Sequence, residues 1–567
     1  MYTRNFVINK LFLIAMNRMH FVLLLFVFEF SKLQSQDFNL PIKEKCVINS
    51  NFGEIRPNHF HAGLDIQTPP NKSLPIHAIE EGFISRIRVG TRGYGKAIYI
   101  SHPNGKTSVY AHLNKFSDKI WKFIQNKQRD RKTFEIDFSP QKHDLPISKD
   151  ELIGYSGNTG NSTGPHLHFE IRDSKNDAAL NPLLYYDFSD TLSPQLKEIY
   201  FFKLEDLNNP DLLQSVSGAR FKQNNKKMKN IMLYSLLDTI RLENDFGIAV
   251  SASDKLNSTS GQQQVYAINI LLNKETFFSV RMDSLPFEET KYINCFTQTN
   301  GELKAKKIMK CFLNKNQELA FIKDTQNRGF FNLKPNEVNE IQIELCDVKM
   351  NKSIYTFKVI QKNNESKIGK SFSHNCKEEN RITKESVSII VPEKAAFNDF
   401  DIYIRQKSVR NAFCKNEYTI EGLNMPLNKS LQIGIKPDVT NPVLLEKLFI
   451  YNTTSDSYCG GKLNDGKIFG ESKSFGNFSL KIDSVGPKIN PLPVTGHSIK
   501  FHVTDTESGI SDFRMYINGE WVYSEYEHKE NVIFHIRKND EQRKKSIVRL
   551  EVTDNRNNTS IKEIELK

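Results

Sequence analysis

The chain has only seven cysteines among its 567 residues, and no two of them are spaced as CxxC. This scarcity excludes a disulfide framework and a cysteine-ligated zinc site, although one or two disulfides stay compatible with it. Tryptophan is also rare, with two residues against 40 phenylalanines, and 25% of the residues are charged. The composition therefore predicts a body that folds in water and is neither disordered nor membrane-spanning.

Long hydrophobic runs are confined to the N-terminus, where LFLIAM and FVLLLFVF are flanked by Arg4, Lys10 and Arg18 and followed by SKLQSQ. These runs are too short for a spanning helix, so the segment predicts a secretory signal peptide over residues 1–36. We expect export to the periplasm, the outer envelope or the medium, with no transmembrane span after signal removal. An uncleaved anchor is the alternative.

The formal charge of +12 is spread over many separate lysines and arginines. Since no basic helical stripe with interleaved aromatics is present, nucleic acid is not an expected partner. An anionic envelope polymer would suit a basic secreted protein through long-range attraction, and a solvated surface without a specific partner is equally compatible.

Short alternating segments dominate the chain and predict an all-β protein. ISRIRVG, KAIYISH, TSVYAHL and HLHFEIR read as strands of one N-terminal antiparallel domain over residues 37–190. The segment 117–131 is different, because Ser117 is a candidate N-cap and apolar residues follow at helical spacing. We predict a helical insertion there.

Two pairs of similar segments indicate repeated β-sandwich modules after residue 190. DTLSPQLKEIYF from Asp190 is similar to DSVGPKINPLPV from Asp483. IQIELCDVKMNKS from Ile341 is similar to VRLEVTDNRNNTS from Val548, and both read as a strand followed by an aspartate and a polar turn. We place breaks near Leu192, Asn380 and Asp483. The expected units are one or two modules over 191–380, one over 381–482, and an immunoglobulin-like module over 483–567.

Eight of the fourteen histidines fall between His59 and His168, which directs attention to the N-terminal domain. In NHFHAGLDI, a bend at Gly63 could bring His61 and Asp65 to one point, whereas His59 has glycine at the matching offset. SVYAHLNKF delivers His112 from a strand, and GPHLHFE places His166 and His168 on one strand face. One carboxylate and several imidazoles on short strands indicate a hydrolytic metal site.

HAGLD, YAHL and GNTGNSTGPHLHFE together resemble the lysostaphin-type (LytM-domain) zinc metalloendopeptidases, peptidase family M23, over roughly residues 40–187. The long β-rich remainder resembles envelope-associated members with β-sandwich tails. The resemblance implies one zinc ion held by His61, Asp65 and His168. It also implies that His112 and His166 are the catalytic pair that orients water and stabilises the transition state, without deciding which of them is the general base.

The same resemblance implies a zinc-dependent endopeptidase that hydrolyses peptide cross-links of bacterial peptidoglycan. The glycine-rich loop 154–164 would then admit a peptide backbone, or it is a plain connection. The alternatives are a non-catalytic LytM-like protein that binds or activates a cell-wall amidase, and an envelope scaffold in which hydrolysis is secondary. The bond that is cut, protein partners and any autoinhibition are not indicated by the sequence.

Overall fold

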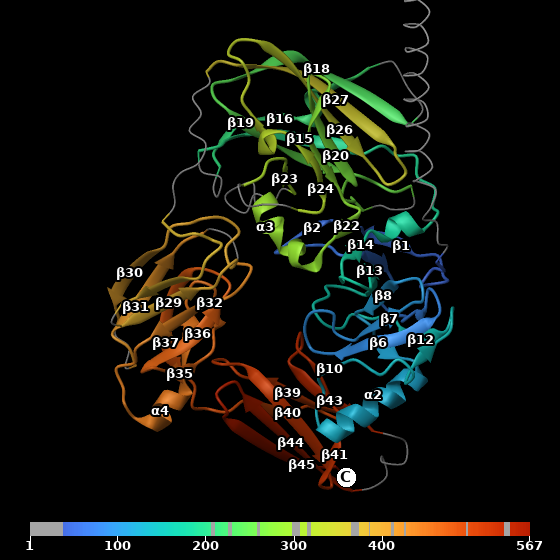
Figure 1. Cartoon of the computed structure of the whole chain (residues 1–567). Coiled ribbons are helices and arrows are strands. Elements are labelled where there is room, and N and C mark those ends of the chain that lie inside the picture. Colours follow the sequence, from blue (N-terminus) through green and yellow to red (C-terminus); the bar gives the residue numbers. More distant parts are fainter. Residues whose placement is uncertain are drawn as a thin grey trace, which may run out of the picture.

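The computed structural model describes most of the chain in twelve segments (Figure 1). They are residues 38–205, 210–224, 230–257, 261–297, 307–314, 319–363, 373–384, 386–409, 413–423, 427–494, 497–537 and 545–566. The predicted signal peptide lies outside these segments. Within them, no helix combines the length and the apolar character that crossing a membrane would require.

Antiparallel strands build the first domain, residues 38–190, around one large sheet ordered β1-β4-β13-β8-β7-β6-β10. Its strands are β1 (Val47–Ser50), β4 (Leu64–Gln67), β6 (Gly82–Val89), β7 (Ala97–Ser101), β8 (Lys106–Ala111), β10 (Ile136–Phe138), β11 (Pro146–Ile147), β13 (His166–Asp173) and β14 (Ala179–Leu180). Two small sheets accompany it, formed by β5 (Pro75–His77), β12 (Leu152–Tyr155) and β9 (Lys115–Phe116), and by β2 (Ile55–Arg56) and β3 (His59–Phe60). The short 3₁₀ helix η2 (Pro182–Tyr185) precedes the exit of the chain.

Paired sheets make up the rest of the chain, which confirms the all-β prediction. The second module, residues 195–361, has a five-stranded and a seven-stranded sheet, the third (380–482) has two five-stranded sheets, and the fourth (488–566) has two four-stranded sheets.

The second module consists of β15 (Gln195–Lys203), β16 (Leu212–Ser217), β17 (Lys222–Gln223), β18 (Ile231–Leu242), β19 (Phe246–Ser253), β20 (Ala267–Leu272), β21 (Glu275–Arg281), β22 (Ser284–Leu285), β23 (Met309–Lys310), β24 (Ile322–Thr325), β25 (Phe330–Phe331), β26 (Val338–Cys346) and β27 (Lys352–Gln361), with η3 (Gly218–Arg220), η4 (Phe287–Tyr292), α3 (Ile293–Phe296) and η6 (Asn327–Gly329). Strands β18 and β27 pair in parallel, and β22 pairs with β14 of the first domain.

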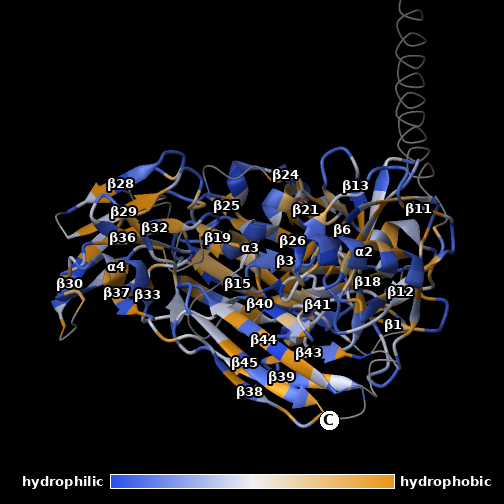
Figure 2. Cartoon of the chain, turned by 90° about the horizontal axis from the view of Figure 1, so that it is seen from below, coloured by the Kyte–Doolittle hydropathy of each residue, from blue (hydrophilic) through white to orange (hydrophobic). Residues whose placement is uncertain are grey.

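The third module consists of β28 (Asn380–Thr383), β29 (Val387–Val391), β30 (Tyr403–Ser408), β31 (Asn416–Glu421), β32 (Leu431–Ile435), α4 (Pro442–Lys447), β33 (Leu448–Asn452), β34 (Ser457–Tyr458), β35 (Lys462–Asn464), β36 (Lys467–Ser472) and β37 (Gly476–Ile482). The fourth consists of β38 (Lys488–Pro491), β39 (Ser498–Thr504), β40 (Ile510–Ile517), β41 (Glu520–Val522), β42 (Glu525–Glu527), β43 (Val532–Ile536), β44 (Ser546–Asp554) and β45 (Thr559–Leu566). Figure 2 shows apolar and polar residues intermixed along the strands of the fourth module, as expected where one face of a strand is buried.

Strand β13 shows how the sequence positions the candidate site. Its residues alternate between two faces, so Leu167, Phe169 and Ile171 are fully buried in the apolar core of the first domain. Burying each of these side chains stabilises the domain by about 1.5–3 kcal/mol. The opposite face carries His166, His168, Glu170 and Arg172, and the packing of the core therefore fixes where these polar groups point.

The predicted helical insertion is confirmed as α2 (Asp118–Arg131), which begins after Ser117 and ends at Lys132 in a left-handed conformation. Ser117 stands at the N-cap, but its hydroxyl makes no capping hydrogen bond. Ile120 and Ile124 are buried, so the helix is held by the apolar face that its spacing indicated.

The four units are arranged in a ring, and the fourth module returns to the side of the first domain (Figure 1). Tyr523 of the fourth module makes an edge contact with Trp121 of α2, with ring centroids 5.0 Å apart. Lys96 of the first domain pairs with Glu525, with 2.9 Å between Nζ and Oε2. Segments more than 400 residues apart in the sequence therefore pack together.

Candidate metal centre

Three side chains predicted to hold a metal come together on the polar face of the large sheet, at its strands β4 and β13. Asp65 on β4 lies directly opposite His168 on β13 in the antiparallel pairing, and His61 precedes β4 after a bend at Gly63. Gly63 fits the bend because a Cβ there would lie 2.3 Å from the carbonyl oxygen of Phe169. The bend expected from the sequence is thus what brings His61 beside Asp65.

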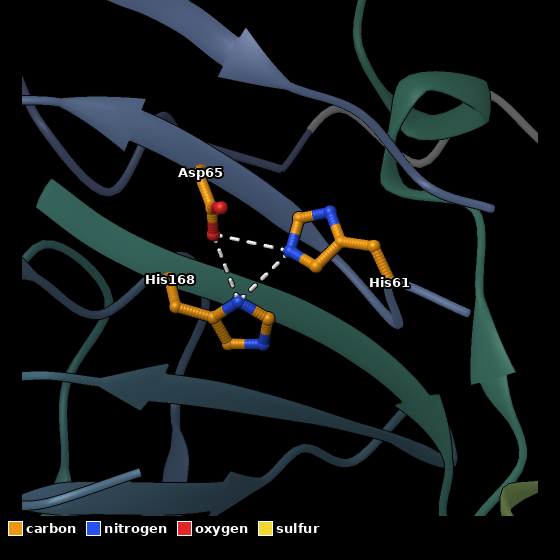
Figure 3. A group of neighbouring side chains, drawn as sticks. All are labelled: His61, Asp65 and His168. Atoms are coloured by element: carbon orange, nitrogen blue, oxygen red, sulfur yellow. Dashed lines mark hydrogen bonds and ion pairs between the residues drawn. The ribbon is translucent and has the colours of Figure 1, made fainter. Parts of the chain in front are cut away.

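The three facing atoms form a small triangle (Figure 3). His61 Nε2 lies 3.1 Å from Asp65 Oδ1 and 3.0 Å from His168 Nδ1, and His168 Nδ1 lies 3.0 Å from Asp65 Oδ1. Bonds from zinc to nitrogen and oxygen are about 2 Å long, so two tetrahedral ligand atoms lie about 3.3 Å apart. The spacing and the donor set fit one zinc ion with a position left open.

Each of the two imidazoles makes a hydrogen bond through the ring nitrogen that points away from the triangle. The nitrogen that faces the triangle therefore keeps a lone pair for a metal. His61 Nδ1 lies 2.8 Å from the carbonyl oxygen of Asn51, and His168 Nε2 lies 2.7 Å from Glu170 Oε1. Both acceptors require a proton on the nitrogen that they contact, so a neutral ring presents an unprotonated His61 Nε2 and His168 Nδ1 to the centre. This arrangement is the one that metal-binding histidines need.

Glu170 is itself held by a buried polar network. Arg172 Nε donates to its Oε2 at 2.6 Å, and the Tyr94 hydroxyl donates to its Oε1. Burial opposes ionisation of Glu170, but Arg172 and His168 hold its pKa below the usual range. A carboxylate that stays ionised keeps the His168 ring oriented toward the centre.

The electrostatics of the triangle favour a cation. Burial raises the pKa of Asp65, but His61 and His168 outweigh that effect and hold the pKa well below its usual range. Burial lowers the pKa of His168, but Asp65 and Glu170 raise it to about 9, whereas burial dominates for His61 and its pKa is lowered. A metal ion would take the place of the proton on His168, because metals bind the deprotonated imidazole.

The two histidines predicted to be catalytic lie beside the triangle. The rings of His112 and His166 have centroids 4.8 Å apart, and His166 Nε2 lies 3.5 Å from Asp65 Oδ1. His112 follows β8 in a left-handed conformation with φ of 60°. Burial lowers the pKa of both, to about 3 for His112, so both rings are neutral near pH 7.

An open cavity of about 800 Å³ gives access to these residues. The loop at Gly164 and Pro165 forms part of its wall, as do Tyr94 and His59. His59 is exposed and hydrogen-bonds the Pro57 carbonyl oxygen, so it lies outside the triangle. None of the seven cysteines lines the cavity.

Arg56 is a site residue that the sequence argument missed. It ends β2, and its guanidinium donates to Asp65 Oδ2 and, at 2.9 Å, to Ser50 Oγ. It therefore holds one carboxylate oxygen and leaves Oδ1 facing the two imidazoles. Glu170 was also missed, although its i+2 spacing from His168 on a strand was a usable signal.

The fold and these side chains define a β domain with a candidate metal centre of the hydrolase type. The pattern of peptidase family M23 matches residues 59–129 and 139–182 within the first domain, in agreement with the resemblance that the motifs indicated. A second pattern, the Zu5-like domain, matches residues 341–483.

Curated relatives match about a fifth of this chain. The chain is 34% identical over 124 residues to the DD-carboxypeptidase/endopeptidase Mpg of Neisseria meningitidis, covering 22% of each protein. It is 29% identical over 140 residues to the peptidoglycan DD-endopeptidase ShyA of Vibrio cholerae, covering 23% of this chain and 26% of the relative. It is 28% identical over 126 residues to lysostaphin of Staphylococcus simulans, covering 22% and 20%. The chain thus spans about a fifth to a quarter of the length of these relatives.

Solved structures also match about a quarter of this chain. The catalytic domain of the M23 protein EnpA from Enterococcus faecalis is 21% identical, with a TM-score of 0.20. The alignment covers 26% of this chain and 98% of that one. The catalytic domain of lysostaphin is 24% identical, with a TM-score of 0.18. The alignment covers 24% of this chain and 86% of that one.

Proposed function

We propose that the protein is a zinc-dependent endopeptidase that hydrolyses peptide cross-links of bacterial peptidoglycan. The observation that carries this proposal is the triangle of His61, Asp65 and His168, with 3.0–3.1 Å between facing atoms, beside a second pair of neutral imidazoles. The match to family M23 and a relative named as a peptidoglycan DD-endopeptidase support the substrate class.

When bound, the zinc ion would polarise the scissile carbonyl and lower the pKa of water from about 15.7 to near 7. His61, Asp65 and His168 would hold it, and the Asn51 carbonyl and Glu170 fix the two rings that face it. Arg56 orients the Asp65 carboxylate.

His112 and His166 supply proton transfer. Their Nδ1 atoms lie 2.8 Å from the carbonyl oxygens of Thr159 and Gly164, so the proton of each neutral ring sits on Nδ1 and Nε2 is left basic. An Nε2 atom of this pair accepts the proton of the attacking water and passes it to the leaving amine as the peptide bond breaks. The depressed pKa of each ring keeps it in the form that accepts this proton.

Export to the cell envelope is part of the proposal, because the predicted signal peptide and the substrate require the same compartment. In this setting the basic chain would be attracted to the anionic wall polymers.

The test is digestion of purified sacculi by the mature chain, followed by mass analysis of the released fragments. We expect cross-linked peptides to be cleaved, with activity lost on chelation and restored by added zinc. His168→Ala should lose both metal and cleavage, whereas His143→Ala should keep both because His143 is exposed and lies outside the cavity. A folded, zinc-loaded chain that releases no fragments while it stimulates a cell-wall amidase would replace the proposal with the non-catalytic alternative.

A further inference from the structure

Three aspartates far apart in the sequence meet where the second module begins. Asp190 lies in the segment that leaves the first domain, Asp254 follows β19, and Asp347 follows β26. One carboxylate oxygen from each lies within 4.8 Å of the other two. Asp254 and Asp347 are 4% and 2% exposed, so this is not a solvated surface cluster.

The hydrogen bonds around the cluster leave it incomplete. Asn351 donates to both oxygens of Asp347, from its backbone nitrogen at 2.8 Å and from Nδ2 at 2.6 Å. Asp254 Oδ1 and Asp190 Oδ2, however, are buried without a hydrogen-bond partner. A buried carboxylate oxygen without a partner loses its hydration and gains nothing in return.

Within the described segments, no lysine, arginine or histidine forms an ion pair with any of the three aspartates. Burial raises the pKa of all three carboxyls, and neighbouring carboxylates raise the pKa of Asp254 and Asp347 further, whereas a hydrogen bond with Asp347 partly offsets the effect of burial at Asp190. Three carboxylates this close repel one another unless a proton or a cation lies between them.

The fourth module contains a similar cluster of three aspartates, but there hydrogen bonds satisfy the carboxylate oxygens. Asp483, Asp505 and Asp554 occupy the corresponding places, namely the entry segment, the end of β39 and the end of β44, and they also bring oxygens within 4.8 Å. Their oxygens accept hydrogen bonds from Ser508, Gly509 and Asn558. The unsatisfied oxygens are therefore particular to the second module.

We propose that Asp190, Asp254 and Asp347 bind one divalent cation of the calcium class. The donor set consists only of carboxylate oxygens, which suits a hard cation that takes six to eight oxygen ligands, and it lacks the nitrogen or sulfur that zinc prefers. Bidentate carboxylates, backbone carbonyls and water can complete such a shell.

The position of Asp190 gives the ion a structural consequence. Asp190 belongs to the connection between η2 and β15, while the other two aspartates belong to the second module. Asn351 Nδ2 also donates to the Asp190 carbonyl oxygen at 3.1 Å. A bound cation would fix the exit of the first domain to the second module, independently of any catalytic activity.

The test is calcium titration of the full chain by calorimetry, together with thermal unfolding in chelator and in millimolar calcium. Asp254→Asn keeps the size of the side chain and removes one charge, and Asp505→Asn is the matched control in the fourth module. We expect the number of calcium ions bound to fall by one in Asp254→Asn, and Asp505→Asn to keep the ion at this site.

The unfolding data distinguish a cation site from a purely structural cluster. In chelator, Asp254→Asn should unfold at the same temperature as the wild type or higher, because repulsion is relieved. In calcium, the wild type should gain several degrees at the unfolding transition, and the variant should gain less. Equal calcium binding by the wild type and Asp254→Asn, or a wild type that binds no calcium, would overturn the proposal. If Asp254→Asn does not fold, Asp190→Asn carries the same test.

Discussion

At the scale of single residues, His168 shows how one imidazole can serve a metal only if its second nitrogen is held. Glu170 Oε1 lies 2.7 Å from Nε2, and the carboxylate is in turn held by Arg172 and Tyr94. Such outer partners fix the tautomer and the orientation of a ligand ring.

We therefore expect Glu170→Gln to weaken zinc binding by about 10- to 100-fold, because the amide no longer draws the proton to His168 Nε2 as a carboxylate does. Zinc affinity measured by competition with a fluorescent chelator checks this. Glu81→Gln, at an exposed position of the same domain, should bind zinc as the wild type does. Unchanged affinity in Glu170→Gln would mean that this carboxylate does not orient the ring.

A second prediction concerns Lys310, which is 4% exposed at the end of β23. Burial lowers its pKa from 10.5 to about 8, while the unfolded chain keeps the ordinary value. Between these pH values the unfolded state binds more protons, so the free energy of unfolding rises with pH from about 8 to about 10.4.

Lys310→Met should remove this rise and stabilise the second module at pH 7 by an amount on the order of 3 kcal/mol, the equivalent of the pKa shift. Urea unfolding at pH 7 and pH 9 provides the measurement. Lys334→Met, at a side chain that is 81% exposed, is the matched control and should leave the free energy of unfolding unchanged at both pH 7 and pH 9. A destabilised Lys310→Met protein would show that the ammonium makes a favourable contact that outweighs its burial.

Residues close in sequence or on one strand face could be predicted, and residues brought in from elsewhere could not. The period of two places His166 and His168 together, and the bend at Gly63 explains His61 with Asp65. Arg56 reaches Asp65 from a separate hairpin, and hydrogen bonds of this kind depend on tertiary packing that no local pattern encodes.

At the scale of elements, the close approach of β4 and β13 determines the geometry of the metal centre. The backbone pairing puts Asp65 directly opposite His168. Gly63 permits this approach, because a Cβ would lie 2.3 Å from the Phe169 carbonyl oxygen and 2.9 Å from Glu170 Cγ.

Gly63→Ala should therefore displace β4 from β13 and reduce zinc binding by at least about tenfold, because a metal site tolerates ligand displacements of only about 0.5 Å. Gly164→Ala is the control, since a Cβ there meets nothing within 4 Å and Gly164 is not among the glycines with positive φ. Zinc content and thermal unfolding of both variants should be measured. A Gly63→Ala protein with full zinc affinity would show that the two strands can separate without moving the ligands.

The elements themselves were largely predictable, because alternation and helical spacing are local signals. The strands of the first domain and the helix α2 occur where the pattern placed them. What the pattern could not give is the partner of each exposed face, such as the contact of Trp121 on α2 with Tyr523.

At the scale of the whole molecule, the contact between the fourth module and the first domain closes the ring and reaches the candidate active-site loop. Lys529 Nζ donates to the Asn158 carbonyl oxygen at 2.6 Å. The next residue, Thr159, offers its carbonyl oxygen to His112 Nδ1 and its hydroxyl oxygen to the Lys96 backbone nitrogen. The closing contact therefore supports the segment that orients His112.

We expect Glu525→Lys to open the ring, because it places a second ammonium against Lys96, whose side chain is only 7% exposed. Losing a buried ion pair of this kind costs about 3–5 kcal/mol, and the like charge adds repulsion. Small-angle scattering should show a larger radius of gyration, and hydrogen exchange should become faster over residues 154–164. Glu527→Lys, two residues along the same strand β42, should leave both measurements at their wild-type values, since Glu527 makes no ion pair with the first domain within the described segments. An unchanged radius in Glu525→Lys would show that the aromatic contacts of Tyr523 and Phe513 hold the ring closed without the ion pair.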